Sequence, residues 1–150
     1  YDGILPVTQD ETGLAVVLGH EIAHAVARHS NERLSQQMLQ QYGATFLGAA
    51  TAGKSAAVQQ GISTLYGIGS QVGVLLPFSR TQETEADKLG LIFMAMAGYD
   101  PSQAIPFWNR MSAQSGNKNS SDFLSTHPSD SKRIAALEKE LPTALAYYKK

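Results

Sequence analysis

The sequence contains no cysteine. This absence excludes a disulfide framework, a cysteine-based zinc finger and a thiol nucleophile, but it leaves the redox compartment open. Any metal ion in this protein must therefore be held by histidine and carboxylate side chains. The chain has 4 histidines and 13 acidic residues for such a site.

Charge is also scarce, and neither sign dominates. Charged residues make up 17% of the chain, and 12 basic against 13 acidic residues give a net charge of −1. This balance excludes the global positive field that nucleic-acid binding usually leaves in a sequence. With 43% hydrophobic residues, the 150-residue chain is instead typical of a single folded domain spanning residues 1–150.

The chain lacks an initial methionine, a secretory signal and a long apolar run. We therefore expect an excised or processed piece. The longest stretch without formal charge lies between Lys54 and Arg80, and its glutamine and serine residues argue against a membrane span. We expect a buried or interfacial helix in this stretch.

Helix signals dominate, and they predict a mainly α fold with little β structure. The first helix is expected to begin near Thr8 or Asp10, with Thr8 and Glu11 as a capping box, and to end near Ser30 with His29 in its last turn. Further helices are predicted over 31–50, 55–69, 80–96, 102–114 and 129–140, the last ended by Pro142. The predicted inward side chains of the second helix are Leu34, Met38, Leu39, Tyr42 and Phe46. The only strand candidates are 4–7 and 74–78.

An HExxH sequence, His20-Glu21-Ile22-Ala23-His24, lies inside the first predicted helix. Two histidines four residues apart project from one helix face, so both imidazoles can bind one zinc ion. Glu21 lies about 100° round the helix, where its carboxylate can take a proton from the attacking water. The alternative is a purely structural role, in which the two histidines form hydrogen bonds within the helix region.

The third ligand must come from elsewhere in the chain. The positions three and six residues after His24 hold Ala27 and Ser30, so the metzincin extension is absent. Glu83 and Asp87 share one face of a later helix, where Glu83 can bind the metal and Asp87 can accept the outer N–H of a ligating histidine. Taken alone, these carboxylates also fit a solvated helix face.

Three segments together resemble a known family. They are His20 to His24, Ser79-Arg80 leading into Glu83 to Asp87, and His127-Pro128 followed by Arg133-Ile134. In this order they resemble the HExxH, SRxxExxAD and HPxxxxRI signatures of the CAAX prenyl protease and HtpX-like zinc metallopeptidases. The chain is most similar to the soluble bacterial cell-envelope members.

This resemblance implies a zincin-like gluzincin fold, one zinc ion held by His20, His24 and Glu83, and Glu21 as the catalytic acid and base. His127 precedes a proline at a helix start, where a turn role is usual. The family pattern favours a place near the metal, where His127 either donates to the oxyanion or ligates zinc and keeps the enzyme latent. Arg133 is interpreted as a partner for a carboxylate such as Asp87, or as a cation lining the cleft.

The leading hypothesis is a zinc-dependent endopeptidase that cleaves extended or unfolded polypeptides in cell-envelope protein quality control, in the periplasm. The alternative is a latent or chaperone-like zinc-bearing binding module closed by His127. A polypeptide substrate is expected, nucleic acid is not, and association with a membrane surface or an envelope protein is left open. Only residues 4–7 represent the substrate-pairing strand that usually precedes the HExxH helix in this family, so we expect truncation on the N-terminal side.

Overall fold

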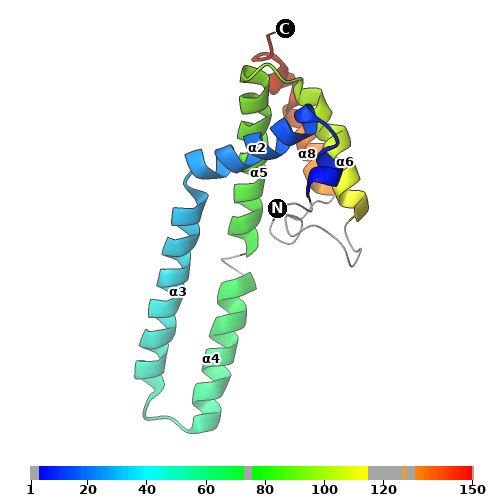
Figure 1. The fold of residues 1–150 in the computed structure, drawn as a ribbon. Coiled ribbons are helices and arrows are strands. Elements are labelled where there is room, and N and C mark those ends of the chain that lie inside the picture. Colours follow the sequence, from blue (N-terminus) through cyan, green and yellow to red (C-terminus); the bar gives the residue numbers. More distant parts are fainter. Residues whose placement is uncertain (1–3, 73–75, 115–126, 128–130, 150) are drawn as a thin grey trace. The chain divides into compact units, whose positions relative to one another are not determined.

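The computed structural model describes residues 4–72, 76–114, 127 and 131–149 (Figure 1). These residues form helices and turns without a strand, which confirms the predicted mainly α fold. The chain divides into two compact units, residues 1–27 with 83–150 and residues 28–82. Both strand candidates were wrong where they are described. Residues 5–8 form α1 (Leu5–Thr8), with Pro6 in its first turn, and residues 76–78 open α5, while 74 and 75 lie outside the described residues.

The HExxH helix is α2 (Glu11–Val26). Its N-cap is Asp10, whose carboxylate accepts a hydrogen bond from the backbone N–H of Gly13 at 2.7 Å. The predicted Thr8 capping box was wrong, because the Thr8 hydroxyl instead donates to the carbonyl of Leu5. The predicted end at Ser30 was also wrong. Arg28 adopts the left-handed conformation (φ 58°), so the chain turns there and a new helix starts.

The rest of the first unit consists of α5 (Leu76–Met96) from Glu83 onward, the short 3₁₀ helix η3 (Pro101–Gln103), α6 (Ala104–Gln114) and α8 (Ser131–Leu145). The predicted helix ends at 96 and 114 are confirmed, whereas α5 begins four residues before its predicted start. Pro142 lies inside α8 and does not end it. Its ring removes one helical hydrogen bond, but the buried side chains of Leu137 and Ala144 hold the helix against the core on both sides of the proline.

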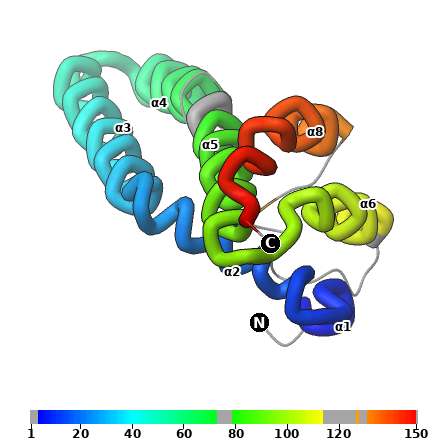
Figure 2. Tube along the Cα trace, turned by 90° about the horizontal axis from the view of Figure 1, so that it is seen from above, coloured from blue at the N-terminus to red at the C-terminus, as the bar shows by residue number. Residues whose placement is uncertain are grey.

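The core of the first unit lies among α1, α2, α5, α6 and α8, and α6 packs against α8 (Figure 2). Phe107, Trp108 and Met111 on α6 are fully buried in this core. On α2 the buried face carries Val16, Val17, Gly19, His20 and Ala23. The more apolar stripe of the same helix is exposed, namely Leu18, Ile22 and Val26. This helix therefore buries its histidine face, and leaves much of its aliphatic face in solvent.

The second unit contains a helical hairpin of α3 (His29–Thr51) and α4 (Ala56–Ser70), joined by a short turn (Figure 1). The predicted helix over 55–69 is confirmed within one residue. His29 was misplaced, because it is the buried first residue of α3 and not part of the last turn of α2. The predicted inward face of α3 was wrong as well, since all five of its large apolar side chains are exposed. No described helix is long and apolar enough to cross a membrane.

Candidate metal centre

Four side chains of the first unit present potential metal ligands to one point. One ligand atom from each of His20, His24, Glu83 and His127 lies within 4.8 Å of the others. The two histidines of the HExxH sequence come from adjacent turns of α2, and Glu83 comes from α5. The structure thus brings together the three predicted ligands and His127, which was also expected near the metal. The neighbours of His127, residues 115–126 and 128–130, lie outside the described residues.

Two glycines allow α2 and α5 to approach closely enough to form this group. A Cβ atom built on Gly19 would lie 2.8 Å from the carbonyl oxygen of Gly90, and one built on Gly90 would lie 2.9 Å from the backbone nitrogen of His20. Any side chain at either position would push the helix backbones apart. Figure 1 shows that α2 and α5 cross, and the two glycines lie at a close contact between these helices. This crossing places His20 beside the face of α5 that carries Glu83 and Asp87.

The distances within the group show nitrogen and oxygen lone pairs directed at one another. The Nε2 atoms of His20 and His24 are 3.0 Å apart, and Nδ1 of His127 lies 3.1 Å from Nε2 of His20. The Glu83 carboxylate lies 3.3 Å from both Nε2 atoms, and both of its oxygens lie 2.9 Å from Nδ1 of His127. A carboxylate and three imidazoles offer more lone pairs than protons at this point. A cation satisfies such a set of donors, and nitrogen and oxygen ligands suit zinc.

A second layer of contacts fixes the orientation of His20. Its Nδ1 atom lies 3.0 Å from Oδ1 of Asp87, so that Nε2 carries the lone pair that faces the group. Arg133 from α8 donates two hydrogen bonds to the same carboxylate, at 2.6 and 2.7 Å. The guanidinium of Arg133 stacks on the Trp108 ring at 3.5 Å, and the same ring meets His20 edge-on. This buried pair of charges is costly to break, since losing one partner typically costs about 3–5 kcal/mol.

The electrostatics of the site favour positive charge at this point. Burial lowers the pKa of His20, but hydrogen bonds to Asp87 and Glu83 outweigh it, so the pKa lies above its ordinary value. For Glu83, burial raises the pKa, but hydrogen bonds from His127, His20 and His24 bring it far below the ordinary range. Glu83 is therefore ionised at neutral pH. The same arrangement of carboxylates attracts a bound cation.

Glu21 lies beside this group and not inside it. Its side chain is 43% exposed, and Oε1 is 3.4 Å from Nε2 of His127. The carboxylate therefore has access to solvent at the edge of the cluster. His127 lies between Glu83 on one side and Glu21 on the other, with its Nδ1 and Nε2 atoms facing different carboxylates.

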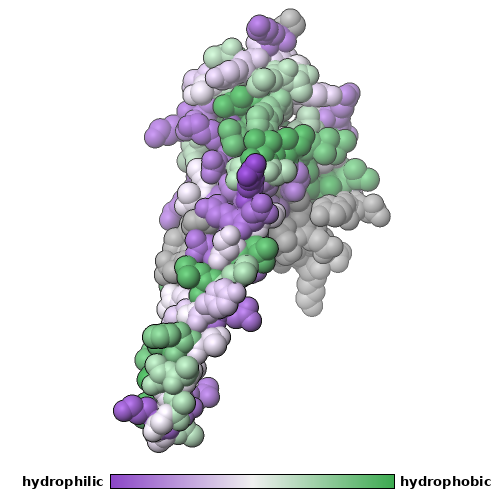
Figure 3. Space-filling view, turned by 90° about the vertical axis from the view of Figure 1, so that its left-hand side faces the viewer, coloured by the Kyte–Doolittle hydropathy of each residue, from purple (hydrophilic) through white to green (hydrophobic). Residues whose placement is uncertain are grey.

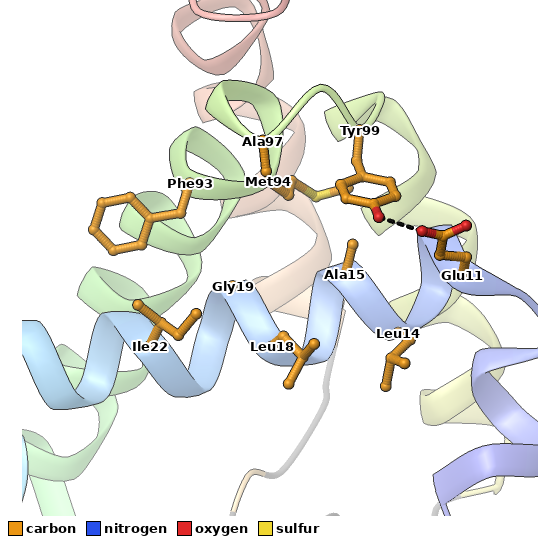
Figure 4. A pocket seen from close by; sticks show the side chains of 10 residues that line it. All are labelled: Glu11, Leu14, Ala15, Leu18, Gly19, Ile22, Phe93, Met94, Ala97 and Tyr99. Atoms are coloured by element: carbon orange, nitrogen blue, oxygen red, sulfur yellow. Dashed lines mark hydrogen bonds between the residues drawn. The ribbon is translucent and has the colours of Figure 1, made fainter.

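A separate apolar pocket of about 350 Å³ lies on the opposite side of α2. Leu14, Leu18 and Ile22 line it from α2, and Phe93 of α5 lies across from Ile22 (Figure 4). The Tyr99 hydroxyl donates a 2.5 Å hydrogen bond to Glu11 at one end, which raises the pKa of Tyr99. None of the four potential ligands lines this pocket, so it is distinct from the candidate metal centre.

The family comparison agrees with the geometry. The model of peptidase family M48 matches residues 1–141. The chain belongs to peptidase family M48. The resemblance to the HtpX-like metallopeptidases that the three sequence motifs suggest is therefore confirmed.

Curated relatives of this M48 chain come from mitochondria and from bacteria. The mitochondrial metalloendopeptidase OMA1 of Schizosaccharomyces pombe is 43% identical over 96% of the chain, which covers 41% of that protein. Human metalloendopeptidase OMA1 is 33% identical over 97% of the chain and 29% of the relative. The β-barrel assembly-enhancing protease of Yersinia pestis is 32% identical over 96% of the chain and 32% of the relative. The chain thus spans less than half the length of these relatives. No solved structure matches it.

The sequence named the polar residues that the structure brings together but not the residues that position them. Trp108, whose ring lies against Arg133 and His20, was not among the predicted site residues. The contact between Gly19 and Gly90 was not predicted either. A glycine inside each of two helices that carry site residues was the available signal, because a buried helix glycine indicates close packing.

Proposed function

We propose that this M48 chain is a zinc-dependent metalloendopeptidase that hydrolyses peptide bonds of extended or unfolded polypeptides. The observation that supports it most directly is the convergence of ligand atoms from His20, His24, Glu83 and His127 on one point. A site for catalytic zinc needs three protein ligands and one further position. Two histidines of an HExxH helix with a glutamate from a second helix supply the three.

In this proposal His20, His24 and Glu83 hold one zinc ion per chain. Asp87 keeps His20 in the tautomer whose Nε2 faces the ion, and Arg133 holds Asp87 in place from α8. When bound, zinc supplies a Lewis acid that polarises the scissile carbonyl and lowers the pKa of water to about 7. The donor set of nitrogen and oxygen atoms fits this ion.

Glu21 is the proposed general base. Its half-exposed carboxylate lies next to His20 in the sequence and at the edge of the ligand group, where it can accept a proton from water and deliver it to the leaving amine. Protonated Glu21 is stabilised at this place, because Nε2 of His127 lies 3.4 Å from its Oε1 and can share the proton.

The position of His127 allows two roles. As a hydrogen-bond donor beside the cluster, it is placed to stabilise the oxyanion of the tetrahedral intermediate. As a fourth ligand, it would close the site and make the chain a latent or chaperone-like zinc-bearing module. The second role is the alternative function, and it is favoured by the 2.9 Å distances between Nδ1 of His127 and the Glu83 oxygens.

Replacing His127 by alanine distinguishes these roles. If His127 stabilises the oxyanion, His127→Ala lowers kcat by about 10²-fold or more while the protein keeps one zinc per chain. This is the expected result, measured on an unfolded protein substrate with zinc determined in parallel. A rise in activity from a low basal level would instead support the latent module.

Removal and return of the metal tests the proposed activity itself. Treatment with a chelator is expected to abolish cleavage of an unfolded substrate such as reduced casein, and stoichiometric zinc is expected to restore it. Stoichiometric magnesium serves as the control and should restore nothing, because it prefers oxygen ligands. Undiminished cleavage after complete metal removal would contradict the proposal.

The compartment and the quality-control role are proposals of the same kind. A periplasmic, cell-envelope placement is supported by bacterial relatives named β-barrel assembly-enhancing protease at 30–32% identity. Relatives named for the mitochondrion reach 43% identity and favour that organelle instead. Fractionation of the native source, with detection of the chain in one compartment, decides between them.

A further inference from the structure

The α3–α4 hairpin is almost free of charge. From Leu34 to Ser79 the sequence carries a single charged residue, Lys54, and no carboxylate at all. Lys54 lies in the turn that joins the two helices. Exposed helices of soluble proteins usually carry charged residues on the solvent face, so this hairpin has an unusual surface for contact with water.

The hydrogen bonds between the two helices are made by polar side chains. The Gln40 amide donates to the Ser70 hydroxyl at 2.7 Å, and the Tyr66 hydroxyl donates to the carbonyl of Gln40. Gly43 makes room for Tyr66, because a Cβ atom there would lie 2.0 Å from the hydroxyl oxygen. Among the described residues of α3 and α4, only His29 is buried. The hairpin therefore has no apolar core of its own.

Most large apolar side chains of the hairpin are exposed, whereas Leu47 and Ile62 are half-buried. Phe46 and Leu65 are 72% and 73% exposed. Exposed large apolar residues are Leu34, Met38, Leu39, Tyr42 and Phe46 on α3, and Val58, Leu65, Ile68 and Val72 along α4 and the turn that follows it. At 100° per residue, the exposed apolar residues of each helix fall within one arc of its surface. On both helices this arc is displaced in the same rotational sense from the face that contacts the other helix. Because the helices are antiparallel, the two arcs therefore lie on the same side of the hairpin. Figure 3 shows hydrophobic surface recurring along the hairpin at the lower end of the view.

We propose that this apolar face of the hairpin docks on an anionic lipid surface, with the two helices lying among the headgroups. Polar interhelical contacts with small residues, and apolar side chains outside, are typical of helices that face lipid. An apolar stripe opposite a polar face is typical of helices that lie in a membrane interface. This docking is independent of the proposed peptidase activity.

The charges of the second unit favour lipid over a second copy of the chain. Arg28, Arg33, Lys54 and Arg80 against the single acid Glu32 give residues 28–82 a net charge of +3. A second unit with the same net charge would repel the first, whereas anionic headgroups attract it. The remaining residues carry a net charge of −4, so the positive charge is concentrated on the unit that has the apolar face.

Flotation of the full chain with vesicles tests this docking. The chain is expected to float with phosphatidylcholine vesicles that contain phosphatidylglycerol, and less with pure phosphatidylcholine. The double variant Phe46→Gln/Leu65→Gln is expected to lower the partition coefficient by about tenfold or more, because both side chains lose their apolar contact with lipid. Lys54→Glu is expected to lower partition several-fold on anionic vesicles, with little change on neutral ones.

The matched control is the double variant Leu5→Gln/Met96→Gln, which alters two exposed apolar residues of the first unit. It should float like the parent chain. Far-UV circular dichroism shows whether each variant keeps its helices. No flotation of the parent chain, equal losses in both double variants, or self-association in sedimentation that Phe46→Gln/Leu65→Gln abolishes without any lipid binding would overturn the proposal.

Discussion

Replacing Glu21 with glutamine is expected to lower the rate of peptide hydrolysis by about 10²- to 10⁴-fold, the range of a lost general base. The amide keeps the size and most hydrogen bonds of the carboxylate but cannot accept a proton. Because Glu21 lies outside the group of four ligands, zinc content should remain at one per chain. The measurement is cleavage of an unfolded protein, with zinc determined on the same samples.

Glu138→Gln is the matched control, because Glu138 is an exposed residue of α8. This variant should cleave at the parent rate. A Glu21→Gln chain with parent activity would refute the assignment of the base, and one that also lost its zinc would show that Glu21 contributes to the metal site.

Replacing Glu83 with alanine is expected to remove zinc and activity together. The variant loses the carboxylate from α5 and leaves only imidazoles at the cluster. Loss of a residue that only orients a ligand typically costs 10- to 100-fold in metal affinity, so loss of a direct ligand should cost more than about 100-fold. Competition with a chromogenic zinc chelator measures this affinity directly.

Glu85→Ala, two residues further along α5, is the control for this loss. Glu85 is exposed and lies outside the group of four. We expect its zinc affinity to equal that of the parent chain within twofold. Parent-like affinity in Glu83→Ala would contradict the proposed third ligand.

The polar chemistry of the site is readable in the sequence because it is set by short spacings. Two histidines four apart must share a helix face, and so must Glu83 and Asp87. The spacing does not reveal that the two faces meet. That meeting depends on Gly19 and Gly90 in contact and on Arg133 held over Trp108, which are long-range features of packing.

Helix ends were predictable where a local signal decides them and wrong where two signals compete. The start of α4 lies one residue from its predicted place, but at the start of α2 Asp10 and not Thr8 caps the helix. The end of α2 depends on the left-handed conformation of Arg28, a residue without the usual glycine or asparagine signal. Pro142 shows the reverse, since tertiary packing carries α8 through a residue that usually ends a helix.

The prediction that the apolar side chains of α3 face inward was wrong for a different reason. It assumed that apolar side chains at helical spacing pack into a protein core. In the hairpin those side chains are exposed, and glutamine, serine and tyrosine form hydrogen bonds between α3 and α4. Periodicity identifies an apolar face but not the partner that covers it.

The central claim is that His20, His24 and Glu83 hold one zinc ion. Crystals of the full chain, grown without added metal and measured on both sides of the zinc absorption edge, test it most directly. The account predicts one anomalous peak bonded to the two Nε2 atoms and to a Glu83 oxygen, at about 2.0–2.2 Å. A peak bound to other residues, or Glu83 turned away from an ion on the two histidines, would contradict it.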